Sequence, residues 1–388
     1  MTRESDRKAL STRLIHAAKR DSSGFQSLAV PTHRGSTVVF PTLEDLDHPT
    51  EGQYRYGLHG TPTHRALTER LAEIEGAEHI QLAPSGLAAI ALTFLSFLNS
   101  GSHLLLPRSS YGPTVDLAFG LLSDFGVETE LYDPMVGGGI AQLLRDETAL
   151  VWCESPGSIS MEIQDVPAIA AAAHARNIPV AIDNTYGAGV LFDAFAAGCD
   201  VSVQALTKYQ AGHSDLLMGS VATRDGELGK RIARAATLLG MGVSPDDCSL
   251  VLRGLKTFEL RLRHLGKSAL EVATWLSRRE EVTAVLHPAF PDCPGHDIWK
   301  RDWTGSASLF SFILGNMPRE QVVAFVEALT LFDIGYSWGG ANSLVITYHD
   351  LDRPSPELGP LLVRLNIGLE DPADLIADLD QALNQSSL

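Results

Sequence analysis

The sequence has few cysteines and few positive charges, and each shortage excludes a class of protein. The four cysteines, Cys153, Cys199, Cys248 and Cys293, are far apart and include no C-x-x-C pair, so a reduced, cytoplasmic protein is indicated. Thirty basic residues stand against 47 acidic ones, which gives a formal net charge of −17. Because a field of that sign repels phosphate backbones, we expect no nucleic-acid partner.

Long uninterrupted hydrophobic runs are also scarce. The most apolar stretch is IQLAPSGLAAIALTFLSFL, residues 80–98, whose length suits a membrane span. Pro84, Ser85 and Gly86 divide it into a short strand, a turn and a helix, so no membrane association is expected. The first twenty residues are polar and lack the apolar centre of a signal peptide.

The pattern of what is present predicts an α/β fold. With 388 residues, of which 45% are hydrophobic, the chain is long enough for two domains. Apolar strands alternate with amphipathic helices from residue 79 to residue 205, which indicates a mostly parallel sheet. A long helix is expected over residues 250–279, followed by a smaller α+β domain. We therefore predict an N-terminal arm (1–60), a large domain (61–249) and a C-terminal domain (250–388).

Several common site motifs are missing. There is no G-x-x-x-x-G-K-[ST], G-x-G-x-x-G or G-x-S-x-G sequence, so nucleotide-binding and serine-hydrolase sites are not supported. His287, Cys293 and His296 lie in a proline-rich loop without a fourth ligand at matching spacing, so we expect no metal site.

Chemically capable side chains instead follow the ends of predicted strands. Lys208 and Asp183 each end a strand, Gly86 opens a helix after one, and Arg364 lies on a C-terminal strand. Each has a structural alternative: a lysine reaching solvent, a capping aspartate, an ordinary turn and a solvent-facing arginine. Together they match one chemistry, in which a lysine forms a Schiff base with pyridoxal phosphate (PLP), an aspartate pairs with the ring nitrogen, a helix start binds phosphate and an arginine binds a carboxylate.

A set of motifs then makes the sequence recognisable. From about residue 36 to the C-terminus, it resembles the cysteine/methionine-metabolism family of PLP enzymes, fold type I, and within it the bacterial cystathionine β-lyases. The motifs that carry the resemblance are YGLHGTPTH, PSGLAAI, ESPGSISMEIQDVPAI, AIDNTYGAGVLF, QALTKYQAGHSD, GHDIWKRDWTGSASLFSF, YSWGGANSL and VRLNIGLED. The T-K-Y-x-x-G-H-S-D pattern is the most specific of them.

The resemblance implies the fold and the role of each site residue. The fold is that of PLP-dependent transferases, with a large domain and a smaller C-terminal α+β domain. The implied cofactor-binding residues are Lys208 for the Schiff base, Tyr111 stacked on the ring, Asp183 at the ring nitrogen, Gly86, Leu87 and Thr207 at the phosphate, and Tyr56 reaching the phosphate of a neighbouring subunit. The implied substrate-binding residues are Ser337, Trp338 and Arg364, with Lys208 and Tyr111 as catalytic residues.

The implied activity is a PLP-dependent carbon–sulfur β-lyase that acts on L-cystathionine or another S-substituted cysteine. Trp338 in YSWGG and the segment ESPGSISME favour the β-lyases over their γ-acting relatives. The alternatives are a γ-acting lyase or synthase and a non-catalytic regulatory protein on this fold. The resemblance also implies a homodimer or homotetramer with shared active sites. Two positions depart from the family pattern: Leu58 replaces a phosphate-binding arginine, and Asn342 replaces a common glutamate.

Overall fold

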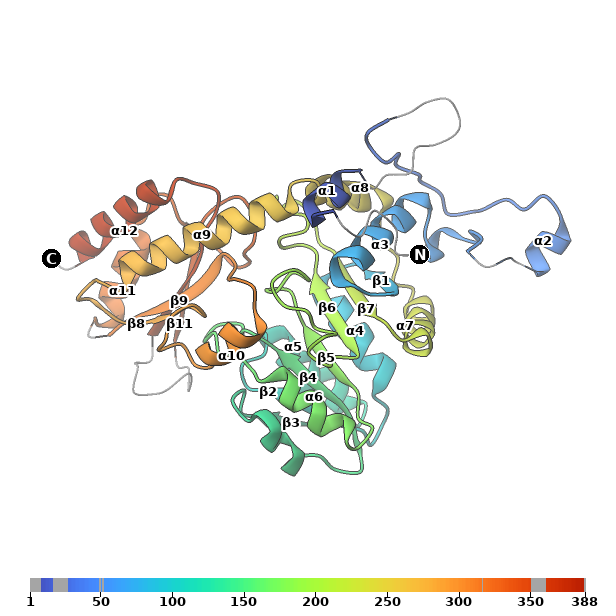
Figure 1. Cartoon of the computed structure of the whole chain (residues 1–388), viewed down its shortest axis with the longest axis horizontal. Coiled ribbons are helices and arrows are strands. Elements are labelled where there is room, and N and C mark those ends of the chain that lie inside the picture. Colours follow the sequence, from blue (N-terminus) through green and yellow to red (C-terminus); the bar gives the residue numbers. More distant parts are fainter. Residues whose placement is uncertain are drawn as a thin grey trace.

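The structure is a computed structural model that describes residues 8–16, 27–48, 50, 52–315, 317–349 and 361–386. Within these ranges the chain forms a seven-stranded and a five-stranded sheet (Figure 1). The larger sheet has the order β1-β7-β6-β5-β4-β2-β3, and within it β7 alone runs against the other strands. Its strands are β1 (His79–Ala83), β2 (His103–Pro107), β3 (Glu128–Tyr132), β4 (Thr148–Glu154), β5 (Val180–Asp183), β6 (Val201–Ala205) and β7 (Gly219–Thr223). The mostly parallel sheet predicted from the sequence is therefore confirmed.

Successive residues of the central strands point to two different hydrophobic cores. In β4, Leu150 and Trp152 join one core, whereas Val151 and Cys153 join the other. The middle of β4 is therefore apolar at successive positions, because both faces of the sheet are covered. The core on the side of Leu150 and Trp152 is covered by α4 (Gly86–Phe97), α5 (Gly112–Leu117), the turn Ala118–Leu122 and α7 (Gly226–Leu238). The core on the side of Val151 and Cys153, called the second core below, is covered by α3 (Pro62–Glu75), the 3₁₀ turn Gly137–Gln142, α6 (Val166–His174) and α8 (Pro245–Leu255).

Helix α3 begins and ends where its sequence predicts. Thr61 and His64 bond reciprocally as a capping box, and Pro62 occupies the first turn. Gly76 ends the helix at a φ of 65°, a left-handed conformation that glycine adopts without a steric penalty.

The single long helix expected over residues 250–279 is wrong. The structure has two helices there, α8, which ends at Leu255, and α9 (Phe258–Leu276). The Arg261 side chain of α9 donates to the Gly254 carbonyl at 2.9 Å and to the Tyr209 carbonyl at 2.8 Å. The Gly254 carbonyl also accepts the Thr257 N–H at 3.1 Å, a bond to the third residue along the chain, which closes a tight last turn at the end of α8.

The smaller sheet has the order β10-β11-β12-β9-β8. One face is covered by α9, α11 and α12, and the other face contributes Leu286, Ile313 and Leu362 to the second core of the large sheet. The elements of this region are β8 (Val282–Leu286), α10 (His296–Asp302), β9 (Leu309–Leu314), α11 (Arg319–Glu327), β10 (Asp333–Ile334), β11 (Leu344–His349), β12 (Leu361–Asn366) and α12 (Pro372–Ser386). The two units therefore share packed surface, and the exact domain boundaries stay a prediction.

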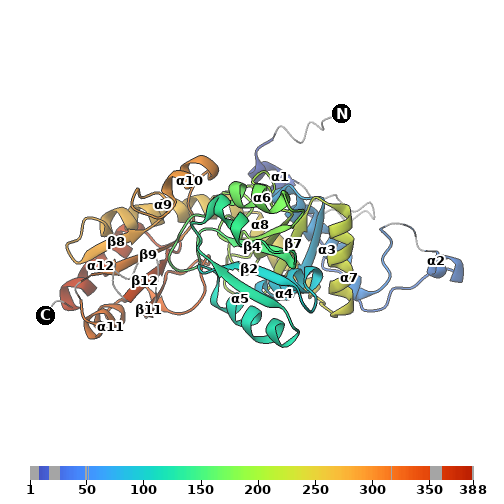
Figure 2. The ribbon, with the colours of Figure 1, turned by 90° about the horizontal axis from the view of Figure 1, so that it is seen from below.

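The described part of the N-terminal arm lies largely on the surface. It contains α1 (Leu10–His16), α2 (Leu43–Asp47) and the short turn Gly57–His59. Both views show α2 projecting away from the two sheets (Figure 1, Figure 2). Leu28, Val39 and Leu43 of this arm are each more than three-quarters exposed. An arm with exposed apolar side chains is typical of one that packs on another chain.

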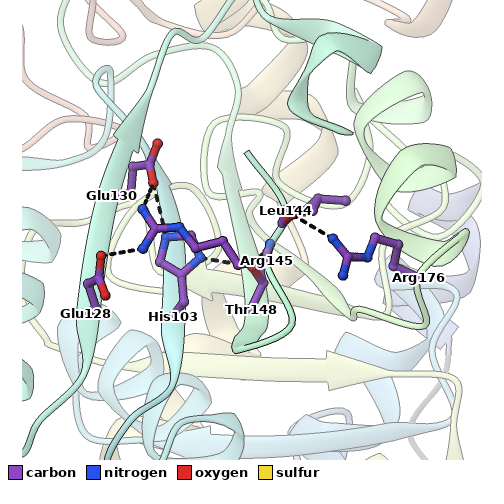
Figure 3. Close-up of polar contacts among 7 residues, drawn as sticks. All are labelled: His103, Glu128, Glu130, Leu144, Arg145, Thr148 and Arg176. Atoms are coloured by element: carbon purple, nitrogen blue, oxygen red, sulfur yellow. Dashed lines mark hydrogen bonds and ion pairs between the residues drawn. The ribbon is translucent and has the colours of Figure 1, made fainter. Parts of the chain in front are cut away.

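Charged residues join the amino ends of β2, β3 and β4 (Figure 3). The Arg145 guanidinium pairs with Glu128 and Glu130, which lie two residues apart in β3. His103, which opens β2, lies within hydrogen-bonding distance of the Thr148 hydroxyl at 2.9 Å. This cluster lies at the edge of the sheet opposite the strands' carboxyl ends, so it ties the strands together without entering the site described below.

Candidate active site

A pocket opens at the carboxyl ends of β4, β5 and β6, the edge at which parallel α/β sheets bind ligands. The volume of the pocket is about 890 Å³, part of which is open to solvent. Seven of the ten site residues predicted from the sequence line it: Gly86, Leu87, Tyr111, Asp183, Thr207, Lys208 and Trp338. These residues come from five different segments, so the fold brings them together.

Lys208 follows the end of β6 in a tight turn, where its N–H donates to the Ala205 carbonyl at 3.1 Å. Its Nζ atom donates to the Ser337 hydroxyl at 2.6 Å and lies 5.2 Å from the centre of a Trp338 ring. Burial lowers the pKa of this amine to about 8, and the charge of Arg364 acts in the same direction, whereas Asp183 opposes it. Near neutral pH a larger fraction of this amine is therefore neutral and nucleophilic than of an ordinary exposed lysine, although most of it is still protonated.

Asp183 ends β5 beside Glu154, which ends β4 in the paired register. The Thr185 N–H donates to the Asp183 carboxylate at 2.9 Å and fixes its orientation. Burial raises the pKa of this carboxyl, and hydrogen bonds from Thr185 and the charge of Lys208 work against that rise. A carboxylate held in this way is suited to pair with a protonated ring nitrogen.

The start of α4 forms a cradle next to β6. The Ser85 hydroxyl accepts the Ala88 N–H at 3.0 Å, while the N–H groups of Gly86 and Leu87 have no acceptor among the described residues. A side chain at Gly86 would place its Cβ only 2.6 Å from the Ala205 Cβ, so glycine lets the helix start approach the sheet. Two free N–H groups at a helix start favour an anion such as phosphate.

The Thr207 hydroxyl, which is predicted to bind the phosphate, is bonded to the backbone of Met218 in this structure. It donates to the Met218 carbonyl at 3.2 Å and accepts the Met218 N–H at 3.1 Å. A bond from this hydroxyl to a phosphate would replace the one to the carbonyl.

Tyr111 is anchored by a residue to which the sequence had assigned no role. Its N–H donates to the Glu154 carboxylate at 2.7 Å, and its ring borders the pocket. Burial raises the pKa of the phenol, and the negative charges of Asp183 and Glu154 raise it further. The spacing of Tyr111 and Glu154 along the chain gives no signal of this contact, because it joins a loop to the end of a distant strand.

Arg364 and Ser337 are not among the residues that line the pocket, but each contacts one that does: Ser337 bonds to Lys208, and Arg364 bonds to Ser158. Arg364 is buried, with 6% of its surface exposed, and donates to the Ser158 carbonyl at 3.3 Å. In the part of the chain that the structure describes, no carboxylate pairs with it. A buried cation without a counter-ion is costly, so this position is suited to an anionic ligand. The solvent-facing alternative for Arg364 is wrong.

Tyr56 does not enter the pocket of its own chain. Its ring is half exposed, and its backbone pairs with Thr37 of the arm. Leu58 lies near Gly242 at a separate depression of the surface. The role of Tyr56 therefore depends on a second chain and stays a prediction.

The loop with His287, Cys293 and His296 uses these side chains locally. Cys293 donates to the Met161 carbonyl, and His296 lies 2.8 Å from the Pro288 carbonyl. Burial lowers the pKa of His287 to about 4. Among the described residues, no three His, Cys, Asp or Glu side chains are grouped as metal ligands would be. No helix in the same residues is long and apolar enough to cross a bilayer.

The arrangement fits PLP. The amine of Lys208 can bind its aldehyde, Asp183 its ring nitrogen and the start of α4 its phosphate, while Tyr111 supplies an aromatic face. All four groups border one pocket, and the Arg364 cation, which contacts Ser158 at the edge of that pocket, is of a type suited to a carboxylate.

Comparison with known proteins agrees with this geometry. Residues 11–384 match the model of the family described as Cys/Met metabolism PLP-dependent enzyme. The chain is 40% identical to a cystathionine β-lyase of Escherichia coli, covering 96% of this chain and 98% of that protein, and 42% identical to one of Bordetella avium, covering 94% of each. A crystal structure of cystathionine γ-synthase from Xanthomonas oryzae pv. oryzae superimposes with a TM-score of 0.89 at 29% identity, covering 98% of this chain and 99% of that one. The chain therefore belongs to the family of Cys/Met metabolism PLP-dependent enzymes.

Proposed function

We propose that the chain is a PLP-dependent carbon–sulfur β-lyase that cleaves L-cystathionine or a related S-substituted cysteine. The observation that carries the proposal is identity of about 40% with cystathionine β-lyases over nearly the whole chain, together with Lys208 and Asp183 in one pocket. The products are a thiol, such as homocysteine, with pyruvate and ammonia. We therefore also propose a role in methionine biosynthesis.

Bound PLP supplies an electrophilic aldehyde and an electron-withdrawing ring that weakens the bonds at the substrate Cα. Arg364 binds the α-carboxylate and orients the substrate. With PLP bound, the Lys208 amine would take the proton from Cα. Asp183 would keep the ring nitrogen protonated through its charge. The protonated Lys208 would return the proton to the sulfur, so that a thiol leaves from Cβ. Addition of water to the remaining three-carbon fragment then yields pyruvate and ammonia.

The second candidate is a γ-acting enzyme on the same scaffold. The superposition with cystathionine γ-synthase favours it, because the same fold and cofactor serve both chemistries. Trp338 favours the β-lyase through the motif YSWGG described above. Its side chain lies in the pocket, with a ring centre 5.2 Å from the Lys208 Nζ atom and 5.4 Å from the centre of the Tyr209 ring.

We also propose that the active protein is a homodimer or a homotetramer with shared active sites. Tyr56 lies outside its own pocket, and the arm that carries it exposes apolar side chains, so a second chain is the natural partner. The four cysteines are unpaired and buried, in line with the cytoplasmic location that we propose.

A product assay tests the function. The purified, PLP-loaded protein is incubated with L-cystathionine and a panel of S-substituted cysteines and homocysteines. We expect pyruvate and a free thiol from the cysteine derivatives. Release of 2-oxobutyrate would identify a γ-acting enzyme, and no keto acid from any substrate would refute both candidates.

A further inference from the structure

The Tyr348 ring lies against the guanidinium of Arg364, with 5.1 Å between the ring centre and Cζ. In the β11–β12 pair, Ile346 lies opposite Arg364 and Leu362 opposite Tyr348, so the two side chains are diagonal neighbours on one face. Leu362 belongs to the core shared with the large sheet, and Tyr348 packs against that core. The pair therefore lies where the two sheets meet.

Arg364 needs help to keep one orientation. Its bond to the Ser158 carbonyl is 3.3 Å long and involves one nitrogen. Within the described residues it has no carboxylate partner, although carboxylates usually hold a guanidinium in place. Burial limits the positions open to this side chain, but one long hydrogen bond fixes the direction of its N–H groups only weakly, and ligand binding would have to fix that direction.

Tyr348 supplies the missing constraint through its ring. An aromatic face attracts a guanidinium and restricts it to a plane. The phenol oxygen takes no part, since it has no hydrogen-bond partner among the residues that the structure describes. Tyr111 and Tyr336 also influence Arg364 electrostatically, but Tyr348 is the tyrosine that stacks on it.

We propose that Tyr348 is a positioning residue for the substrate α-carboxylate. Its ring holds the Arg364 guanidinium flat, the Ser158 carbonyl holds one edge, and the other N–H groups are left for the carboxylate. This inference rests on the proposed function, because that function assigns the carboxylate to Arg364.

The test compares Tyr348→Leu, Tyr348→Phe and Phe195→Leu in the PLP-loaded protein. Phe195 is a matched control, since its ring lies 4.8 Å from the Arg224 guanidinium and away from the pocket. The dissociation constants of L-alanine and L-alaninamide are measured from the change in cofactor absorbance. Neither compound has a leaving group on Cβ, so the preference for the carboxylate is measured without any lyase turnover.

We expect wild type to prefer L-alanine and Tyr348→Leu to reduce that preference about tenfold, the size expected for a desolvated contact between a cation and a ring. Tyr348→Phe should retain the preference within about twofold, and Phe195→Leu should match wild type. With a lyase substrate, Tyr348→Leu should raise KM far more than it lowers kcat. If Tyr348→Leu does not fold, Tyr348→Ile, whose branched side chain suits a strand, takes its place.

An unchanged preference in Tyr348→Leu would overturn the inference, and so would a Tyr348→Phe variant as impaired as Tyr348→Leu. Arg364→Leu separates this failure from failure of the proposed function. If Arg364→Leu keeps the carboxylate preference, the assignment of Arg364 is wrong and the inference falls with it. If the preference shifts as expected but no substrate is cleaved, the role of Tyr348 stands and the lyase assignment fails.

Discussion

The Nζ atom of Lys208 donates a hydrogen bond to the Ser337 hydroxyl at 2.6 Å, although 129 positions separate the two residues. Ser337 has a φ of 88°, a left-handed conformation that costs free energy in any residue except glycine. Two residues later, a side chain at Gly339 would place its Cβ 3.2 Å from the Lys208 Cβ. The C-terminal unit thus packs a strained turn directly on the lysine of the large sheet.

Lys208→Ala tests the catalytic assignment. Wild type should be yellow because PLP bound to an amine absorbs visible light, and the variant should lose that band. Without its proton acceptor, turnover should fall at least about 10²- to 10⁴-fold. Absorbance spectra and pyruvate release measure the two effects. A variant with wild-type turnover would show that another residue carries the reaction.

The titration of Lys208 can be followed in the protein freed of PLP. Its pKa of about 8 predicts that amine-specific acylation is half-maximal near pH 8, as measured by peptide mass spectrometry. Arg364→Leu should move the midpoint up, because the arginine charge lowers this pKa, and Asp183→Asn should move it down. Lys267, exposed on α9, controls for access of the reagent. Shifts in the opposite directions would refute this account of the site's electrostatics.

Asp183→Asn separates catalysis from cofactor binding. The amide keeps the shape of the side chain but removes the charge that holds the ring nitrogen protonated. We expect turnover to fall roughly a hundredfold, the scale of a lost acid–base contribution, while PLP affinity changes much less. The exposed Asp124→Asn serves as a control. Equal turnover in wild type and Asp183→Asn would contradict the proposed role.

Leu58→Arg tests the departure from the family pattern at the arm. If a phosphate contact is missing, an arginine should restore a charge-assisted bond of about 1.5–3 kcal/mol and tighten PLP binding roughly ten- to hundredfold. The melting temperature should rise for the holoenzyme and not for the apoenzyme. Weaker binding would mean that another group already fills the space. No change in affinity or assembly would mean that residue 58 is remote from every phosphate site.

The carboxyl group of Glu75, which lies away from the pocket, should make the free energy of unfolding depend on pH. It is buried, bonded to Ser202 and Gln204, and burial raises its pKa from 4.5 to about 7. Because the pKa of Glu75 is higher in the folded state than in the unfolded state, its contribution to the free energy of unfolding is complete below pH 4.5. This contribution is lost as the pH rises through 7. The loss approaches about 3 kcal/mol above pH 8.

Urea unfolding of Glu75→Gln between pH 5 and pH 8 measures this effect. The stability of the variant relative to wild type should increase with pH, because the amide does not ionise. Glu69→Gln, on the exposed side of the same helix α3, should show no such trend. A pH-independent difference between Glu75→Gln and wild type would disprove the assignment.

The sequence predicts correctly which face of a strand a side chain lies on where apolar and polar residues alternate along that strand. Alternation along β12 predicts Arg364 and Asn366 on one face and Val363 and Leu365 on the other. The structure agrees, because Val363 and Leu365 lie in the core of the C-terminal unit whereas Arg364 and Asn366 do not. The position of Lys208 follows in the same way from the end of an apolar strand. In both cases local spacing determines the direction of the side chain.

Contacts between distant segments escape this reasoning. The bond from Tyr111 to Glu154 and the stacking of Tyr348 on Arg364 depend on how loops and strands meet in space. At the break between α8 and α9, the Arg261 side chain and the Thr257 N–H both bond to the Gly254 carbonyl, whereas helical periodicity alone continues across the break. Tyr56 lies outside the pocket of its own chain, and the role that we propose for it involves a second chain.

The two faces of β12 also constrain how this protein can evolve. Removal of one residue between Leu361 and Arg364 would turn the arginine into the C-terminal core and Val363 toward the pocket. The charge would then be buried among apolar side chains, so folding and substrate binding would fail together. We therefore expect an insertion or deletion in this strand to act as a folding defect, whereas replacement of a side chain at constant strand length can change substrate binding alone.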